Sequence, residues 1–292
     1  MEKAALIGAG EIGQAIGRLL GNNNVDHLFW DKDPDKSAGD LSSVLSGADV
    51  IFFCVPSWNL REALFSAKER VKGSEILVFV SKGLEPETGM NAIEIALDVL
   101  PEAKLVFIGG PMIAEEIMLG KGGAAVIASK DARAAQIVKE GLSSADFFAT
   151  VSDDIQGIVF AGVLKNIYAL IIGAAEGLGY GVNIKGFMMT ESLSEMGDVI
   201  TSLGGKKDAA YGKAGLGDFI ATASGSSSSN WSAGFSFANG ENPKKVSEGM
   251  SSFSCLHRRL GDISKFKILS ASGDIMENKD PKSSIDKAIS GK

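Results

Sequence analysis

The chain has 292 residues, 45% of them hydrophobic, which is enough for one large domain or two of ordinary size. Its formal charge of −7 argues against nucleic acid or an anionic membrane as the main partner. The two cysteines cannot form a disulfide framework, and the two histidines are not in a metal-ligand spacing. We therefore predict no metal centre and a small-molecule partner.

Short apolar runs alternate with amphipathic segments through the first half of the chain. The runs predict strands at 4–8, 27–30, 49–55, 75–80, 104–110, 124–129 and 146–151. The segments between them predict helices at 12–20, 58–71, 89–100, 114–119 and 132–142. Strands that are apolar on both faces and alternate with helices are typical of a mostly parallel sheet covered on both sides.

Strand patterns stop near residue 152. A long apolar helix is expected after Asp153 and Asp154, then a helix near 184–203 and several shorter ones, the last in the polar tail. The segment 224–229 is expected to be a polar loop. The predicted fold class is α/β: a Rossmann-like, mostly parallel sheet domain at 1–152, followed by an all-helical domain at 153–292.

The chain begins with a strand-like run and no basic leader, so we expect a cytoplasmic protein. The apolar run 158–178 is long enough to span a bilayer, but it contains Lys165 and Glu176. We expect it to be a core helix that braces the two domains or faces a second subunit, and a homodimer is one arrangement that the sequence allows.

The first predicted strand leads into a glycine-rich turn. In GAGEIG, Gly8 would permit the tight turn, Gly10 the approach of a diphosphate, and Gly13 close packing of the helix. Asp31 ends the next strand at the distance where a carboxylate accepts hydrogen bonds from the ribose hydroxyls. The alternative is a structural turn beside a surface acid. This arrangement predicts a dinucleotide site that favours NAD over NADP, although Lys32 would soften that preference.

Three further strand ends carry polar or glycine residues. Val55-Pro56-Ser57 marks either a ligand edge or a plain strand end. Lys82 follows the next strand, where a lysine either faces the cofactor or is simply solvated. Gly110-Pro111 follows another strand and is expected to start a helix at its proline.

Lys165 lies within one of the most apolar stretches, IVFAGVLKNIYALIIGAAEGL. A buried ammonium costs several kcal/mol unless it is paired or loses its proton. Proton transfer would justify that cost, whereas the alternative is a lysine that snorkels to the helix edge. Asp218, in Gly-Leu-Gly-Asp, is either a second site residue or an ordinary helix N-cap.

The ordered set of these motifs resembles the NAD(P)-dependent glycerol-3-phosphate dehydrogenase family over nearly the whole chain. The most specific segments are GVLKNIYALIIGAAEGLGYG at 162–181 and AGLGDFIATAS at 214–224. The family reduces dihydroxyacetone phosphate to glycerol 3-phosphate, which supplies phospholipid synthesis. The resemblance implies that Lys165 protonates the substrate oxygen, with burial favouring its neutral amine, and that Asp218 orders this lysine.

The resemblance also implies the remaining site residues. The catalytic set is Lys165, Lys82 and Asp218; the substrate-binding set is Lys82, Gly110, Asn166, Ser228, Ser229 and Asn230; the cofactor-binding set is Gly8, Gly10, Glu11, Ile12, Gly13, Asp31, Lys82, Ala114 and Glu248, with NAD as cofactor.

Two positions depart from the family pattern. Ser229 stands where the family has a phosphate-binding arginine, and Met112 replaces a small polar residue. Serines 226–229 at a helix start would offer hydroxyls and N–H groups instead, or Arg258 or Arg259 would reach in from a later helix. The alternatives to dihydroxyacetone phosphate reduction are three. The protein could be an enzyme for another small phosphorylated or phosphonate carbonyl compound, a relative of β-hydroxyacid dehydrogenases or ketopantoate reductase, or a non-catalytic dinucleotide-binding protein.

Overall fold

The computed structural model describes residues 1–225 and 228–290, and the chain divides into two compact units. Unit 1 comprises Met1–Lys82 and Met90–Val159, and unit 2 comprises Gly83–Gly89 and Phe160–Lys292. We expected a single boundary after residue 152. The division instead falls inside a long helix, after Val159, and the short segment Gly83–Gly89 packs with the helical unit.

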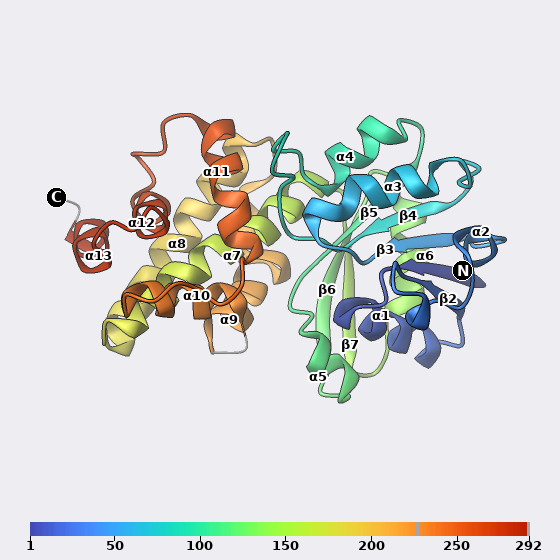
Figure 1. The fold of residues 1–292 in the computed structure, drawn as a ribbon, viewed down its shortest axis with the longest axis horizontal. Coiled ribbons are helices and arrows are strands. Elements are labelled where there is room, and N and C mark those ends of the chain that lie inside the picture. Colours follow the sequence, from blue (N-terminus) through green and yellow to red (C-terminus); the bar gives the residue numbers. More distant parts are fainter. Residues whose placement is uncertain (226–227, 291–292) are drawn as a thin grey trace. The chain divides into compact units, whose positions relative to one another are not determined.

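Unit 1 is built on a seven-stranded sheet in the order β2-β1-β3-β4-β5-β6-β7 (Figure 1). All neighbouring strands pair in parallel except β5 with β6, which confirms the mostly parallel sheet. The strands are β1 Lys3–Ile7, β2 Asp26–Trp30, β3 Val50–Phe53, β4 Ile76–Phe79, β5 Lys104–Gly109, β6 Gly123–Ala128 and β7 Phe147–Ser152.

Helices cover both faces of this sheet because successive strand side chains point to opposite sides. Phe52, Val78 and Val106 belong to one buried cluster together with residues of α1, α5 and α6. Figure 1 shows α3 and α4 side by side over the other face. These helices are α1 Glu11–Asn22, α3 Leu60–Lys68, α4 Ala92–Val99, α5 Ala114–Met118 and α6 Ala132–Leu142.

Two short elements were not expected from the sequence. A 3-10 turn spans Pro34–Lys36, and helix α2 spans Leu41–Leu45. Both are too short for apolar periodicity, and each is held by a capping aspartate. The expected helix 58–71 begins instead with a 3-10 turn at Ser57–Asn59 and ends at Lys68.

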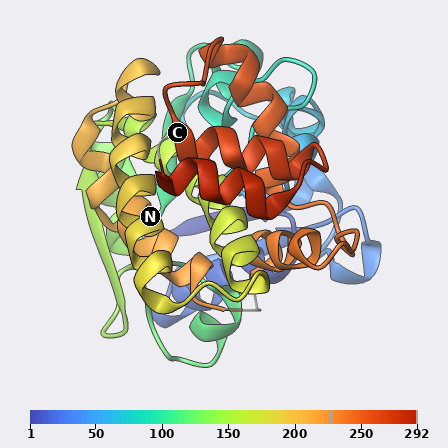
Figure 2. The same cartoon turned by 90° about the vertical axis from the view of Figure 1, so that its left-hand side faces the viewer.

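Unit 2 is helical in its described part, as expected. Its helices are α7 Ile155–Gly177, which starts in unit 1, α8 Val182–Ser202, α9 Asp218–Ala223, α10 Ser229–Ala238, α11 Glu248–Leu260, α12 Lys267–Met276 and α13 Pro281–Ser290. Figure 2 shows α12 and α13, in red, lying side by side. Asp154 accepts the backbone N–H of Gly157 at 3.0 Å, which confirms an acidic cap at the start of α7.

Helix α7 is apolar enough to cross a membrane, but its most apolar 18-residue window is 100% buried inside the protein. It is therefore a core helix. Helix α10 packs directly on it: a Cβ at Gly234 would lie 1.8 Å from the carbonyl oxygen of Leu170.

Candidate active site

The glycine-rich turn after β1 has the conformation that we predicted. Gly8 has φ of +103°, and a Cβ there would lie 2.6 Å from the carbonyl oxygen of Cys54. A Cβ at Gly13 would lie 2.1 Å from the carbonyl oxygen of Gly8. Gly10 precedes α1, and a Cβ added there would meet no atom within 4 Å. The turn is therefore packed on its protein side and open at Gly10, where the backbone amides that begin a helix favour an anion.

Asp31 holds this turn from the end of β2. Its carboxylate accepts the backbone N–H of Ala9 at 2.7 Å and that of Asp33 at 3.0 Å. Partial burial raises the pKa of Asp31, but the hydrogen bonds from Asp33 and Ala9 outweigh burial, so its pKa lies below the usual value. The carboxylate is thus ionised at neutral pH. Lys32 pairs with Glu62 at 2.7 Å on the exposed surface.

A cleft opens at the carboxyl ends of β1, β2 and β3, where the strand order reverses. Such switch points are the ligand crevices of open α/β sheets. The cleft contains the glycine turn, Asp31 and the predicted Val55-Pro56 segment; its lining residues are Gly8, Gly10, Trp30, Asp31, Lys32, Cys54, Val55, Pro56, Asn59, Ala63 and Ser66. The Ser81 hydroxyl, after β4 at the same edge, is buried without a partner among the described residues. These features fit a dinucleotide.

The neighbouring strand ends bring Lys82 and Gly110 together. Lys82 Nζ donates to the carbonyl oxygen of Gly110 at 2.8 Å. Gly110 has φ of +140°, and a Cβ there would lie 2.5 Å from the Ala124 carbonyl oxygen. The following helix begins at Ala114, which confirms the predicted helix 114–119. The expectation that Pro111 starts it is wrong, because 111–113 continue as loop. Met112 is buried in the sheet core, which explains an apolar side chain there.

Two other predicted cofactor residues lie at the start of α1. Glu11 is exposed in its first turn, whereas Ile12 packs partly buried against the sheet core. Only the backbone of Ile12 is therefore suited to meet a diphosphate.

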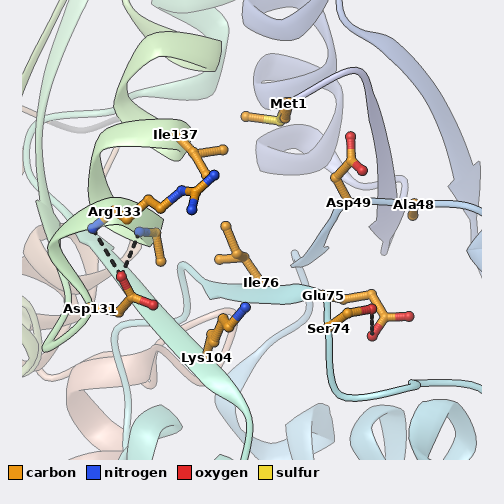
Figure 3. Close-up of a pocket in the computed structure, with 11 residues that line it drawn as sticks. Met1, Ala48, Asp49, Ser74, Glu75, Ile76, Lys104, Asp131, Arg133 and Ile137 are labelled. Atoms are coloured by element: carbon orange, nitrogen blue, oxygen red, sulfur yellow. Dashed lines mark hydrogen bonds between the residues drawn. The ribbon is translucent and has the colours of Figure 1, made fainter.

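A second cavity lies at the opposite edge of the sheet, where β3, β4 and β5 begin (Figure 3). Its carboxylates already have backbone partners: Asp49 accepts the N–H of Glu2, Glu75 that of Lys72, and Asp131 that of Arg133. This cavity lies at the amino ends of the strands, so we assign it no part in cofactor binding.

In unit 2, Lys165 is 7% exposed on the central helix α7 and does not snorkel. Its Nζ donates to Thr222 Oγ1 at 2.7 Å and lies 3.2 Å from Asp218 Oδ1. We expected burial to favour the neutral amine. A carboxylate 3.2 Å from Nζ acts in the opposite direction, because an adjacent negative charge favours the ammonium form, the form able to donate a proton.

Asp218 and Thr222 are one turn apart on the short helix α9, so both side chains face α7. Gly217 is the N-cap residue of this helix and Asp218 lies in its first turn, so the alternative role of Asp218 as the N-cap is wrong. Thr222 was missed by the sequence analysis. The signal was available: it lies four residues after Asp218, and residues at this spacing share a helix face.

A second buried cluster adjoins Lys165 on the chain. Asn230 Nδ2 donates to Asn166 Oδ1 at 2.8 Å, and Asn230 Oδ1 accepts the backbone N–H of Gly249 at 3.0 Å. A Cβ at Gly249 would lie 2.7 Å from the Asn166 carbonyl oxygen, so this position requires glycine. The predicted residues Asn166, Asn230 and the Glu248 segment are therefore brought together around the starts of α10 and α11.

The serine-rich segment caps α10. Ser228 accepts the Trp231 backbone N–H at 3.3 Å, and Ser229 is the first residue of the helix. Ser226 and Ser227 lie outside the described residues. The two arginines considered as replacements bind elsewhere: Arg258 donates to the Pro86 carbonyl and Arg259 to that of Gly89.

The open glycine turn with its ionised acid, and a buried lysine paired with a carboxylate, define a dinucleotide-dependent oxidoreductase. Within the described ranges 1–225 and 228–290, no cluster of three or more His, Cys, Asp or Glu side chains is suited to hold a metal ion.

Sequence models of the NAD-dependent glycerol-3-phosphate dehydrogenase N-terminus and C-terminus match residues 36–135 and 154–286. A glycerol-3-phosphate dehydrogenase [NAD(P)+] of Listeria monocytogenes is 33% identical over 276 residues, covering 85% of this chain and 82% of the relative. One from Clostridium perfringens is 31% identical over 272 residues, with 85% and 82% covered. The chain therefore belongs to the NAD-dependent glycerol-3-phosphate dehydrogenase family.

The fold agrees with this assignment. A solved glycerol-3-phosphate dehydrogenase from Coxiella burnetii superposes with a TM-score of 0.90 at 24% identity, covering 99% of this chain and 98% of that one. A ketopantoate reductase from Ralstonia eutropha superposes less closely, with a TM-score of 0.58. The glycine turn and Asp31 precede residue 36, where the match to the family model begins. Their assignment to the cofactor site therefore depends on the geometry described above.

Proposed function

We propose that this protein transfers a hydride between NAD(H) and the dihydroxyacetone phosphate/glycerol 3-phosphate pair. The observation that carries the proposal is the buried Lys165, held at 2.7 Å by Thr222 and at 3.2 Å by Asp218. Family membership supports the same reaction. We also propose that the enzyme works in the cytoplasm, without nucleic acid or membrane, and supplies glycerol 3-phosphate for phospholipid synthesis.

The residues divide the chemistry between them. When bound, the reduced nicotinamide supplies a hydride to the carbonyl carbon of the substrate. The oxygen then gains negative charge, and Lys165 donates a proton to it, completing the alcohol. Asp218 compensates the ammonium before the transfer, and Thr222 fixes its direction. The Asn166–Asn230 pair holds α7 and α10 together and positions the substrate beside the lysine.

The experiment is steady-state oxidation of NADH with dihydroxyacetone phosphate, compared with ketopantoate and a phosphonate analogue. We expect dihydroxyacetone phosphate to have the highest kcat/KM. Turnover only with another ketone would favour the diverged substrate that Ser229 suggests. NADH binding without turnover of any ketone would instead favour a dinucleotide-binding protein.

A cofactor prediction follows from Asp31. Replacing Asp31 with Ala removes one hydrogen bond to the turn, one from Asp33 and the charge that repels a 2′-phosphate, so NADH affinity should fall about tenfold relative to NADPH affinity. The lowered pKa keeps the carboxylate ionised, so the wild type should prefer NADH throughout the range from about pH 5 to about pH 8. Fluorescence titration with both cofactors at several pH values measures this, and an unchanged preference in the variant would refute the role.

A further inference from the structure

The segment that follows Lys82 is held by helix α11. Gly83–Gly89 comes directly after Lys82 in the chain but packs with the helical unit, to which α11 also belongs. The backbone N–H of Leu84 donates to Ser252 Oγ at 2.9 Å, and both residues are 0% exposed. Helix α11 therefore fixes the chain two residues after Lys82, by a bond that water does not reach.

Ser252 uses its hydroxyl differently from two other fully buried serines of the helical unit. Ser192 and Ser272 are also 0% exposed, and each donates to the carbonyl oxygen four residues earlier in its own helix. That bond is common for a serine inside a helix. Ser252 instead accepts an N–H from a segment 168 positions away in the chain. If this oxygen were removed, the buried Leu84 N–H would lose its acceptor, so the segment would have to move to satisfy it.

The Ser252 bond limits the directions open to Lys82. On one side of Lys82, strand β4 is fixed in the sheet up to Phe79. On the other side, Gly83 alone separates Lys82 from the N–H that Ser252 holds. Glycine has wide backbone freedom and no side chain that packing can hold. The direction of the Lys82 side chain, whose Nζ donates to the Gly110 carbonyl oxygen at 2.8 Å, therefore depends on the Ser252 bond.

The same helix carries other predicted site residues. It begins at Glu248, and the N–H of the next residue bonds to Asn230 Oδ1 at 3.0 Å. Ser252 and Arg259 follow Glu248 at spacings that place all three on one face of α11. Arg259 donates to the last carbonyl oxygen of the segment at 3.0 Å. One face of α11 thus carries the predicted cofactor residue and two side chains that hold the segment after Lys82.

We propose that Ser252 is a positioning residue for hydride transfer. It acts through the Leu84 N–H and sets the direction in which Lys82 meets the substrate. This inference rests on the proposed function, because it takes Lys82 as a substrate-binding residue. A displacement of about 1 Å at such a group can cost about 100-fold in rate, so one buried hydrogen bond is enough to matter.

The test is a double-mutant cycle between Ser252 and Lys82. Ser252→Ala alone should lower kcat/KM for dihydroxyacetone phosphate about tenfold or more. In the Lys82→Ala background, the same replacement should change kcat/KM by no more than about twofold, because no amine is left to misplace. If the Lys82 variants turn over too slowly, the same cycle is measured by calorimetry in the Kd of glycerol 3-phosphate, with NADH bound so that no reaction occurs.

A matched control separates positioning from general stability. Ser272→Ala removes an equally buried hydroxyl that bonds within its own helix, and it should keep wild-type kinetics. Circular dichroism and thermal melting check that both serine variants are folded. If Ser252→Ala has the kinetics of Ser272→Ala, or loses the same factor with and without Lys82, Ser252 does not position Lys82, and the proposed function stands. If the wild type does not reduce dihydroxyacetone phosphate at all, both proposals are wrong.

Discussion

Replacing Lys165 with Ala should lower kcat by about 10²- to 10⁴-fold, because it removes the general acid that completes the alcohol. NADH affinity should stay within a few-fold of wild type, since the glycine turn and Asp31 are untouched. Steady-state kinetics and fluorescence titration measure the two quantities. Lys185→Ala removes the 2.8 Å ion pair with Glu176 in the same unit and should retain wild-type turnover.

Lys165→Ala also leaves the Asp218 carboxylate buried without its cation. Such a change commonly costs about 3–5 kcal/mol of stability. The second variant, Lys165→Met with Asp218→Asn, removes both charges and keeps the volume. We expect it to be folded, by circular dichroism and thermal melting, and inactive. A folded Lys165 variant with wild-type turnover would refute the assigned role.

Replacing Gly13 with Val should abolish NADH binding and destabilise unit 1. The reason is steric: the first side-chain carbon would lie 2.1 Å from the Gly8 carbonyl oxygen, so the turn cannot keep its shape. Thermal unfolding and NADH titration measure both effects, and we expect a loss of affinity of about 100-fold or more.

Two other glycines serve as controls: Gly10 in the same turn and Gly21 on the helix α1 that follows it. Gly10→Ala meets no atom within 4 Å, so it should leave stability unchanged while weakening NADH binding, because the added methyl occupies the space of the diphosphate. Gly21→Ala is exposed on α1, meets only His27 at 3.7 Å, and should be neutral or stabilising. A Gly13 variant as stable as Gly21→Ala would contradict the packing described here.

The sheet was predictable because most of its strands are short apolar runs bounded by polar residues. The predicted run 104–110, for example, corresponds to the strand Lys104–Gly109. Helix α2 was not predicted because its five residues are too few to show the helical periodicity of apolar residues. The apolar pattern predicted the helix at 114–119 correctly, whereas Pro111 suggested an earlier start, because a proline alone does not specify how far a loop continues.

The candidate site was predictable where a charged residue interrupts an apolar run of the sequence, as Lys165 does. Its partners were harder to identify from the residues alone, because Thr222 is 57 positions away and its spacing from Asp218 appears in many helices.

Chemical rescue of Lys165→Ala tests the central assignment most directly. Small primary ammonium ions added to the assay should enter the space left by the side chain and restore dihydroxyacetone phosphate reduction in proportion to their concentration, until the site saturates. Tetramethylammonium, which has no proton to donate, should not restore it. Equal rates with both ions, or no response to any ammonium ion in a folded variant that binds NADH, would contradict proton donation by Lys165.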